Sequence, residues 1–146
     1  MAEYAELHCH SYFSLLDGAS SPEDLVQAAV EKGLRALALT DHDNLSGAVR
    51  FTTAARRAAL HGVVGAEVTL GDGAHLTLLA ETQAGYANLC RLITAARMEA
   101  KVEGGQAEED EESWTGKTAP ALRWEVLAAH SQGLIALSGC RTGEAD

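Results

Sequence analysis

The sequence predicts an α/β fold with mostly parallel strands. Short apolar runs typical of buried strands alternate with segments whose apolar residues recur at helical spacing. The chain has 146 residues, of which 47% are hydrophobic and 22% charged, as in a soluble globular protein. This length suits one domain with a real core and is too short for two ordinary domains. We therefore expect residues 1–146 to belong to a single domain.

Turn-forming and helix-ending residues separate the predicted elements. In chain order these are a strand at 4–8, a helix at 20–33, a strand at 34–40, a helix from Asn44 or Ser46 to about residue 62, strands at 63–70 and 75–80, helices at 86–98 and 122–130, and a strand at 133–139. Residues 103–118 are acidic and Gly-rich without periodicity, which predicts a flexible surface loop.

Capping signals and apolar spacing justify the helices. In the helix at 20–33, Ser21 can cap the first turn, Pro22 suits that turn and Gly33 can end the helix. The other helices rest on apolar stripes, which are Leu45, Val49 and Ala55 in the second and Leu89, Leu92, Ile93 and Ala96 in the third.

Composition restricts the partners and the compartment. The net charge of −10 favours cations and provides no general electrostatic surface for nucleic acid, so any DNA must be held mainly outside this chain. Three widely spaced cysteines without a Cys-x-x-Cys pair indicate a reducing compartment. The chain shows no signal peptide and no apolar run of the roughly 18 residues that a membrane span needs. We expect a cytoplasmic protein without a membrane partner.

The stretch "HCHSYFSLLDG" contains two histidines at a spacing that suits a shared metal ion. In a strand, His8 and His10 point to the same side, while Cys9 points to the other side and is expected to pack. Taken alone, so short a pattern favours two half-buried histidines over metal ligands.

Further potential ligands lie in or beside other predicted strands. His42 lies between Asp41 and Asp43 directly after one strand, and Glu67 lies within the next. His75 opens a strand and Cys140 follows the last one. Such a set exceeds one tetrahedral ion and predicts two or three divalent ions, with zinc favoured by the cysteine and manganese or iron as alternatives. Clusters of this kind activate water for attack on phosphorus. The remaining histidines, His61 and His130, are interpreted as structural.

Five segments in order resemble the PHP (polymerase and histidinol phosphatase) domain, specifically the N-terminal part found in bacterial C-family DNA polymerase III alpha subunits and nearest their error-prone branch. They are "HCHSYFSLLDGA", "ALALTDHDNLSG", "GAEVTL", "HLTLLAETQAGYANLCRLITAA" and "GLIALSGCRTGE". The resemblance implies a partial, distorted (β/α)7 TIM-like barrel with a trinuclear metal site at the strand ends. The implied metal ligands are His8, His10, Asp17, His42, Glu67, His75 and Cys140.

The resemblance also implies roles for individual residues. Glu67 is expected to bridge metals, and Asp17 and His42 are expected to serve catalysis with it. Asp41 matches no family ligand, and we expect it to make a supporting hydrogen bond. The family's closing Asp-x-His motif is absent, so residues 1–146 are expected to be the N-terminal portion of one PHP domain.

The implied activity is hydrolysis of phosphodiesters, as in a 3′–5′ exonuclease, within a DNA polymerase. The expected partners are a DNA 3′ end reached through the parent polymerase, the rest of that polymerase or other replisome subunits, and a second copy paired through the open barrel edge. Two alternatives remain. One is a non-catalytic, metal-stabilised scaffold of the polymerase, and the other is a stand-alone phosphatase acting on a small phosphomonoester.

Overall fold

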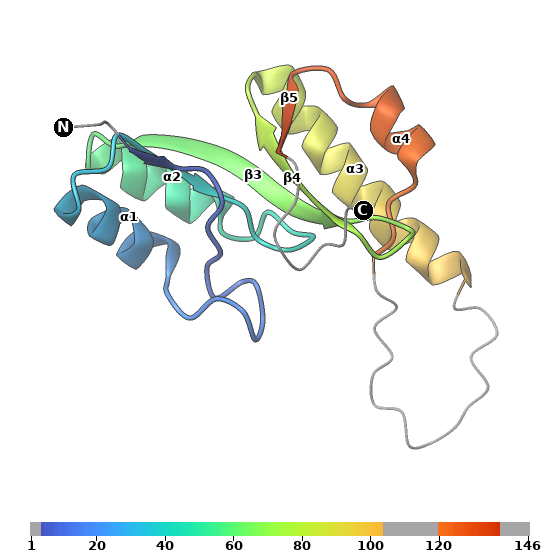
Figure 1. Cartoon of the computed structure of the whole chain (residues 1–146), viewed down its shortest axis with the longest axis horizontal. Helices are drawn as coiled ribbons and strands as arrows, with labels where there is room; N and C mark the ends of the chain where they lie inside the picture. Colours follow the sequence, from blue (N-terminus) through green and yellow to red (C-terminus); the bar gives the residue numbers. More distant parts are fainter. Residues whose placement is uncertain (1–3, 104–119, 138–146) are drawn as a thin grey trace.

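The computed structural model describes residues 4–103 and 120–137, which form one five-stranded sheet with four helices (Figure 1). Their order is β1 (Ala5–Glu6), α1 (Pro22–Glu31), β2 (Ala36–Leu39), α2 (Ala48–Arg57), β3 (His61–Thr69), β4 (His75–Ala80), α3 (Gln83–Glu103), α4 (Trp124–Ala129) and β5 (Leu134–Leu137). Every predicted strand and helix is present. The predicted acidic loop at 103–118 lies outside the described residues, apart from Glu103 at the end of α3.

The strands follow one another across the sheet in the order β1-β2-β3-β4-β5. β1, β2 and β3 are parallel, while β4 is antiparallel to both β3 and β5. Four strands therefore share one direction, which confirms the predicted mostly parallel strands, and β4 is the exception. The turn at 70–74 explains the reversal, because a parallel connection needs a crossover of a dozen or more residues. Gly73 provides the positive φ of 85° in this turn.

The two N-terminal helices begin differently. The Ser21 side chain accepts a hydrogen bond from the Asp24 N–H and forms a capping box with that residue, as predicted for α1. α2 begins later than predicted, with Gly47 at its N-cap. The Asn44 side chain is instead used in the preceding turn, where its oxygen accepts the Ser46 N–H. The buried stripe of α2 consists of Ala48, Phe51 and Ala55, so the prediction is confirmed for Ala55 and wrong for Val49, which is 74% exposed.

Two groups of buried apolar residues hold the helices on the sheet. The first joins α1 and α2 to β2 and consists of Val26, Ala29, Leu37, Leu39, Phe51 and Ala55. The second joins α3 and α4 to β3 and β4 and consists of Ala66, Val68, Leu70, Leu78, Leu89, Leu92, Ala96, Leu122 and Leu127. The predicted stripe of α3 is confirmed, since Leu89, Leu92 and Ala96 are buried in this second core.

The cysteines and the helices can be compared with the expectations drawn from composition. Cys9 and Cys90 are free thiols. Burial, together with the charges of Glu6 and Asp41, raises the pKa of the Cys9 thiol to about 11, which agrees with a packing role. Among the described helices, none combines the length and apolar character that a membrane crossing requires.

Candidate metal centre

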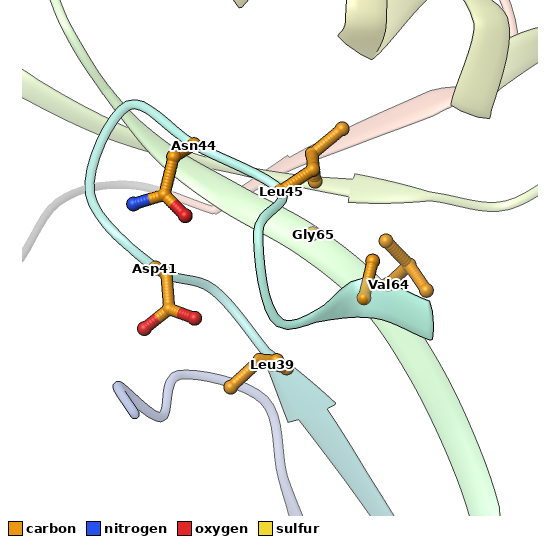
Figure 2. Close-up of a pocket in the computed structure, with 7 residues that line it drawn as sticks. Leu39, Asp41, Asn44, Leu45, Val64 and Gly65 are labelled. Atoms are coloured by element: carbon orange, nitrogen blue, oxygen red, sulfur yellow. The ribbon is translucent and has the colours of Figure 1, made fainter. Parts of the chain in front are cut away.

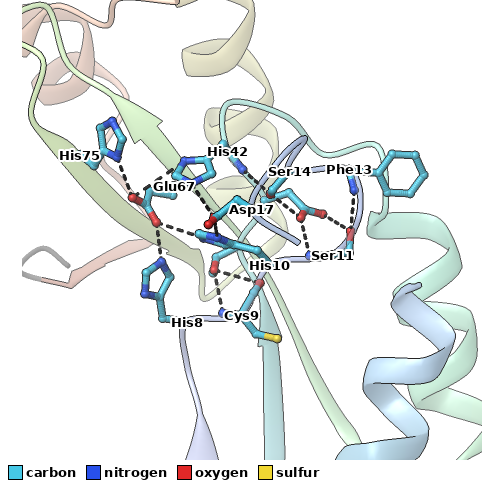
Figure 3. A network of polar contacts seen from close by, with 12 residues as sticks. His8, Cys9, His10, Ser11, Phe13, Ser14, Asp17, His42, Glu67 and His75 are labelled. Carbon is cyan, nitrogen blue, oxygen red and sulfur yellow. Dashed lines mark hydrogen bonds and ion pairs between the residues drawn. The ribbon is translucent and has the colours of Figure 1, made fainter. Parts of the chain in front are cut away.

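Six of the seven predicted ligands come together at one edge of the sheet (Figure 3). They are His8 and His10 after β1, Asp17 in the loop that follows, His42 after β2, Glu67 within β3 and His75 at the start of β4. The seventh, Cys140, lies outside the described residues. The last described residue before it in the sequence, Leu137, pairs with Thr77 of β4.

The reversed direction of β4 brings His75 to this edge. In an all-parallel sheet, the first residue of a strand lies at the edge opposite to the carboxyl ends of its neighbours. Here β4 pairs antiparallel to β3, with Thr69 opposite His75 and Glu67 opposite Thr77. The beginning of β4 therefore meets the residues that follow β1 and β2.

Glu67 is the centre of the cluster and is 2% exposed. Its Oε2 contacts His8 Nε2 and lies 3.1 Å from His10 Nε2. Its Oε1 lies 2.9 Å from His75 Nδ1 and 3.9 Å from His42 Nδ1. A buried carboxylate is costly without strong donors or cations, and here both oxygens face imidazoles.

Asp17 forms a second, more accessible carboxylate in the same cluster. Its Oδ2 contacts His10 Nδ1 and lies 3.1 Å from His42 Nε2. The side chain is 53% exposed. The ring centroids of His10 and His42 are 4.4 Å apart, so Asp17 joins two histidines that already lie against each other.

These contacts change the acidity of three groups. Burial opposes ionisation of Glu67, but the histidine hydrogen bonds and charges outweigh it and lower the pKa of Glu67 to about 2. The hydrogen bond with Glu67 raises the pKa of His10, against the effect of burial and with help from Asp17. The hydrogen bond with His10 lowers the pKa of Asp17. The site therefore favours the ionised form of both carboxylates and shifts His10 toward its protonated form.

The donor set fits divalent metal ions. Within residues 4–103 and 120–137, the possible ligand atoms form three groups, and the atoms of each group lie within 4.8 Å of one another. The groups are His8, His10 and Glu67; His10, Asp17 and His42; and His42, Glu67 and His75. Two ligands of one zinc ion lie at most about 4.2 Å apart, because each bond is about 2.1 Å long. Small side-chain movements would thus close each group, and imidazole and carboxylate donors suit zinc, manganese or iron.

Asp41 and Asp43 lie in the turn after β2 and point their carboxylates to different partners. The predicted supporting hydrogen bonds of Asp41 go to Ser11 and Ser14 in the loop after His10. Asp43 accepts hydrogen bonds from the N–H and hydroxyl of Thr69 on β3. Sequence reasoning missed the two serines, although their positions between His10 and Asp17 were a signal.

Gly18 closes the loop that carries Asp17, and we expect Gly18→Ala to disrupt it. A Cβ at this position would lie 2.0 Å from the carbonyl oxygen of Ser11, so the backbone must move. The substitution should lower the melting temperature and weaken metal uptake, both measurable on the purified protein. Gly71→Ala is the matched control, because its Cβ would meet no atom closer than 4.0 Å. Equal behaviour of the two variants would contradict this role for Gly18.

The profile of the PHP domain family matches residues 6–146. The chain belongs to the PHP domain family. The resemblance expected from the five sequence segments is thereby confirmed.

Relatives of this PHP domain include much longer proteins. An error-prone DNA polymerase of Symbiobacterium thermophilum is 50% identical over 143 residues, which cover 97% of this chain and 13% of that polymerase. An error-prone DNA polymerase of Cutibacterium acnes is 43% identical over an alignment of 152 residues, which covers 96% of this chain and 12% of that polymerase. The chain thus spans only 12–13% of the length of these two relatives.

Solved structures confirm the predicted fold class. An amidohydrolase from Chromobacterium violaceum, solved with bound sulfate and no metal, matches with a TM-score of 0.55 and 31% identity over 68% of this chain and 34% of that one. A protein assigned as a metal-dependent phosphoesterase, from Bifidobacterium adolescentis, matches with a TM-score of 0.55 and 22% identity over 90% of this chain and 51% of that one. The sheet of this PHP domain is accordingly a curled half-barrel of the same mixed α/β type.

Proposed function

We propose that this PHP domain is part of a bacterial error-prone DNA polymerase and hydrolyses phosphodiester bonds at a metal centre, in the manner of a 3′–5′ exonuclease. The observation that carries the proposal is the convergence of four imidazoles and two carboxylates into three overlapping ligand groups. The polymerase context is supported by the relatives that share 43–50% identity over nearly the whole chain.

The overlap of the groups supports a centre of two to three divalent ions. Each pair of groups shares one residue, which is His10, His42 or Glu67. One Glu67 oxygen faces His8 and His10 and the other faces His75, so each oxygen lies in a different ligand group, which supports a bridging role. Zinc is our first expectation, with manganese or iron as alternatives. Cys140 is the seventh residue of the proposed ligand set, and its thiolate would favour zinc over the other ions.

Divalent ions at such a site supply a Lewis acid for phosphoryl oxygens and lower the pKa of water. Glu67, which is buried, would fix the distance between the two ligand groups that share it. His42 would contribute to both groups on its side of the cluster. Asp17, the exposed carboxylate, would face the solvent from which a phosphoester arrives.

The deciding experiment measures metal content and two activities on the native polypeptide that carries this domain. Release of nucleotides from a labelled single-stranded 3′ end is compared with release of phosphate from a small monoester. His10→Ala should abolish nucleotide release and lower metal content. His61→Ala is the matched control, because His61 lies at the exposed start of β3 outside the cluster.

Each other outcome selects a different function. Monoester hydrolysis alone would support the stand-alone phosphatase. Bound metal without turnover of either substrate would support a metal-stabilised scaffold of the polymerase. A protein that binds no metal would contradict the proposed centre.

Metal affinity should fall as the pH decreases from about 8 to about 6, because imidazoles must be neutral to bind metal. The raised pKa of His10 means that a proton occupies this ring above the ordinary pKa of about 6.5 in the metal-free protein. Proton competition should therefore begin above that pH. Titration of the protein with Zn²⁺ at several pH values checks this, and an affinity independent of pH would contradict it.

The proposed partners follow from the same context. DNA would reach the site at its 3′ end while held by the parent polymerase, because this chain carries a net charge of −10. The rest of the polymerase or other replisome subunits would contact the domain. β1 and β5, the two outer strands of the described sheet, are the edges through which a homodimer would form. Light scattering that finds only monomers would contradict the dimer.

A further inference from the structure

Asp41 is a buried carboxylate that none of the three ligand groups contains. Its Oδ1 accepts the Ser11 N–H at 2.7 Å and the Ser14 hydroxyl at 2.7 Å, while its Oδ2 accepts the Ser11 hydroxyl at 2.8 Å. Only 2% of the residue is exposed, so these hydrogen bonds replace those that water would make. The three donors all belong to the loop after His10 (Figure 3).

Asp41 accepts three of the hydrogen bonds that attach this loop to the turn after β2, and the Asn44 side chain adds one to the Phe13 carbonyl. The backbone hydrogen bonds at Asp17 are internal to the loop, since the Asp17 N–H and the Gly18 N–H both donate to the Ser14 carbonyl, at 3.1 and 2.9 Å. The Ser14 N–H donates to the Ser11 carbonyl at 2.9 Å. Ser11 and Ser14 therefore form the base of a tight turn, and Asp41 binds that base.

The same network reaches two other ligands through the backbone. The Ser14 hydroxyl oxygen accepts the His42 N–H at 3.1 Å. The Glu67 N–H donates to the Asp41 carbonyl at 3.2 Å, and the Asp43 N–H donates to the Glu67 carbonyl at 2.8 Å. Asp41 thus connects the segment that carries Asp17 to those that carry His42 and Glu67.

Packing holds Asp41 itself in place. The turn after β2 lies against β3, and the residues that line the small pocket between them include Leu39, Leu45, Val64 and Gly65 (Figure 2). β3 is paired with β2 on one side and with β4 on the other, which fixes the surface against which this turn packs. The Asp41 carboxylate is therefore a fixed point to which the loop is bound.

We propose that Asp41 is a positioning residue that sets the metal affinity of the group formed by His10, Asp17 and His42. This inference rests on the proposed function, because it assumes that the cluster holds metal. Asp41 contacts none of these three side chains directly but fixes the loop of Asp17 and, through Ser14, the backbone of His42. The ligands on β3 and β4, Glu67 and His75, are held by the strand ladder and depend on it less.

The test is a Zn²⁺ titration of the native protein and its variants, with bound zinc measured by elemental analysis after dialysis. Asp41→Ala should weaken one class of zinc site by about 10–100-fold, as removal of a supporting partner typically does. The other sites should stay within about twofold of the unaltered protein. Asp41→Asn should have a smaller effect, because the amide keeps one acceptor oxygen.

Amide hydrogen exchange supplies a readout that needs no metal. Residues 12–18 should exchange faster in Asp41→Ala, while the β3–β4 ladder should be unchanged. Asp43→Asn is the matched control, because Asp43 is a mostly buried carboxylate of the same turn whose partner is Thr69 and not the loop. If Asp41→Ala does not fold, Ser14→Ala takes its place, since it removes one of the three donors and the acceptor for His42.

The outcomes are distinct. Unchanged zinc affinity in folded Asp41→Ala would overturn this inference, and so would an equal weakening of all sites in both Asp41→Ala and Asp43→Asn. Either result would leave the proposed function intact. A native protein that binds no zinc, manganese or iron would contradict the proposed function and this inference together.

Discussion

Substitution of Glu67 by alanine is expected to abolish both the proposed metal binding and the proposed phosphodiester hydrolysis. Glu67 belongs to two of the three ligand groups and contacts His8, His10 and His75. Its removal should therefore reduce affinity by more than the about 10–100-fold loss typical of an outer partner. Elemental analysis and the 3′-end nuclease assay measure the two effects.

One further variant separates the charge of Glu67 from its volume. Glu67→Gln keeps the shape of the side chain but removes the charge that balances the imidazoles, so it should also lose metal. Glu31→Gln is the matched control, because Glu31 lies on α1 outside the cluster. Retention of all ions by Glu67→Ala would show that Glu67 does not bridge them.

Removal of metal by a chelator is expected to lower the melting temperature by on the order of 10 °C. Ions that bind only the folded state stabilise it by about 2.7 kcal/mol for each site at a hundredfold excess over the dissociation constant. In a domain of this size, 1 kcal/mol corresponds to several degrees. The effect should be large here because the cluster joins segments next to four strands, β1 to β4.

Thermal unfolding followed by circular dichroism, with and without chelator, measures this difference. Glu67→Gln should melt at one temperature under both conditions, because it has no metal to lose. A native protein whose melting temperature is the same with and without chelator would contradict a stabilising metal centre.

Much of the fold is visible in local sequence signals. Ser21 and Pro22 mark the start of α1, and the apolar run before Asp41 marks β2, since capping and burial depend on nearby residues. The start of α2 was mispredicted because Asn44 uses its side chain in a turn, where the same residue type could equally have capped the helix. Local sequence does not distinguish these two uses.

The site shows a similar division. Histidine and carboxylate residues near strand ends indicated a metal centre, and six of them meet in space. The supporting role of Ser11 and Ser14 was not predicted, because a serine after a histidine has many possible partners. Only the approach of Asp41 from the next strand selects them.

The sequence by itself determined the ligand types, the order of strands and helices, and membership of the PHP domain family. The tertiary structure alone decided which distant side chains meet, such as His8 and His10 against Glu67 and the two serines against Asp41. The physical reason is that these contacts join residues far apart in the chain, which only strand pairing across the sheet brings together. The short turn before His75 predicts that β4 reverses direction, but no periodicity within a single segment encodes which residues His75 will meet there.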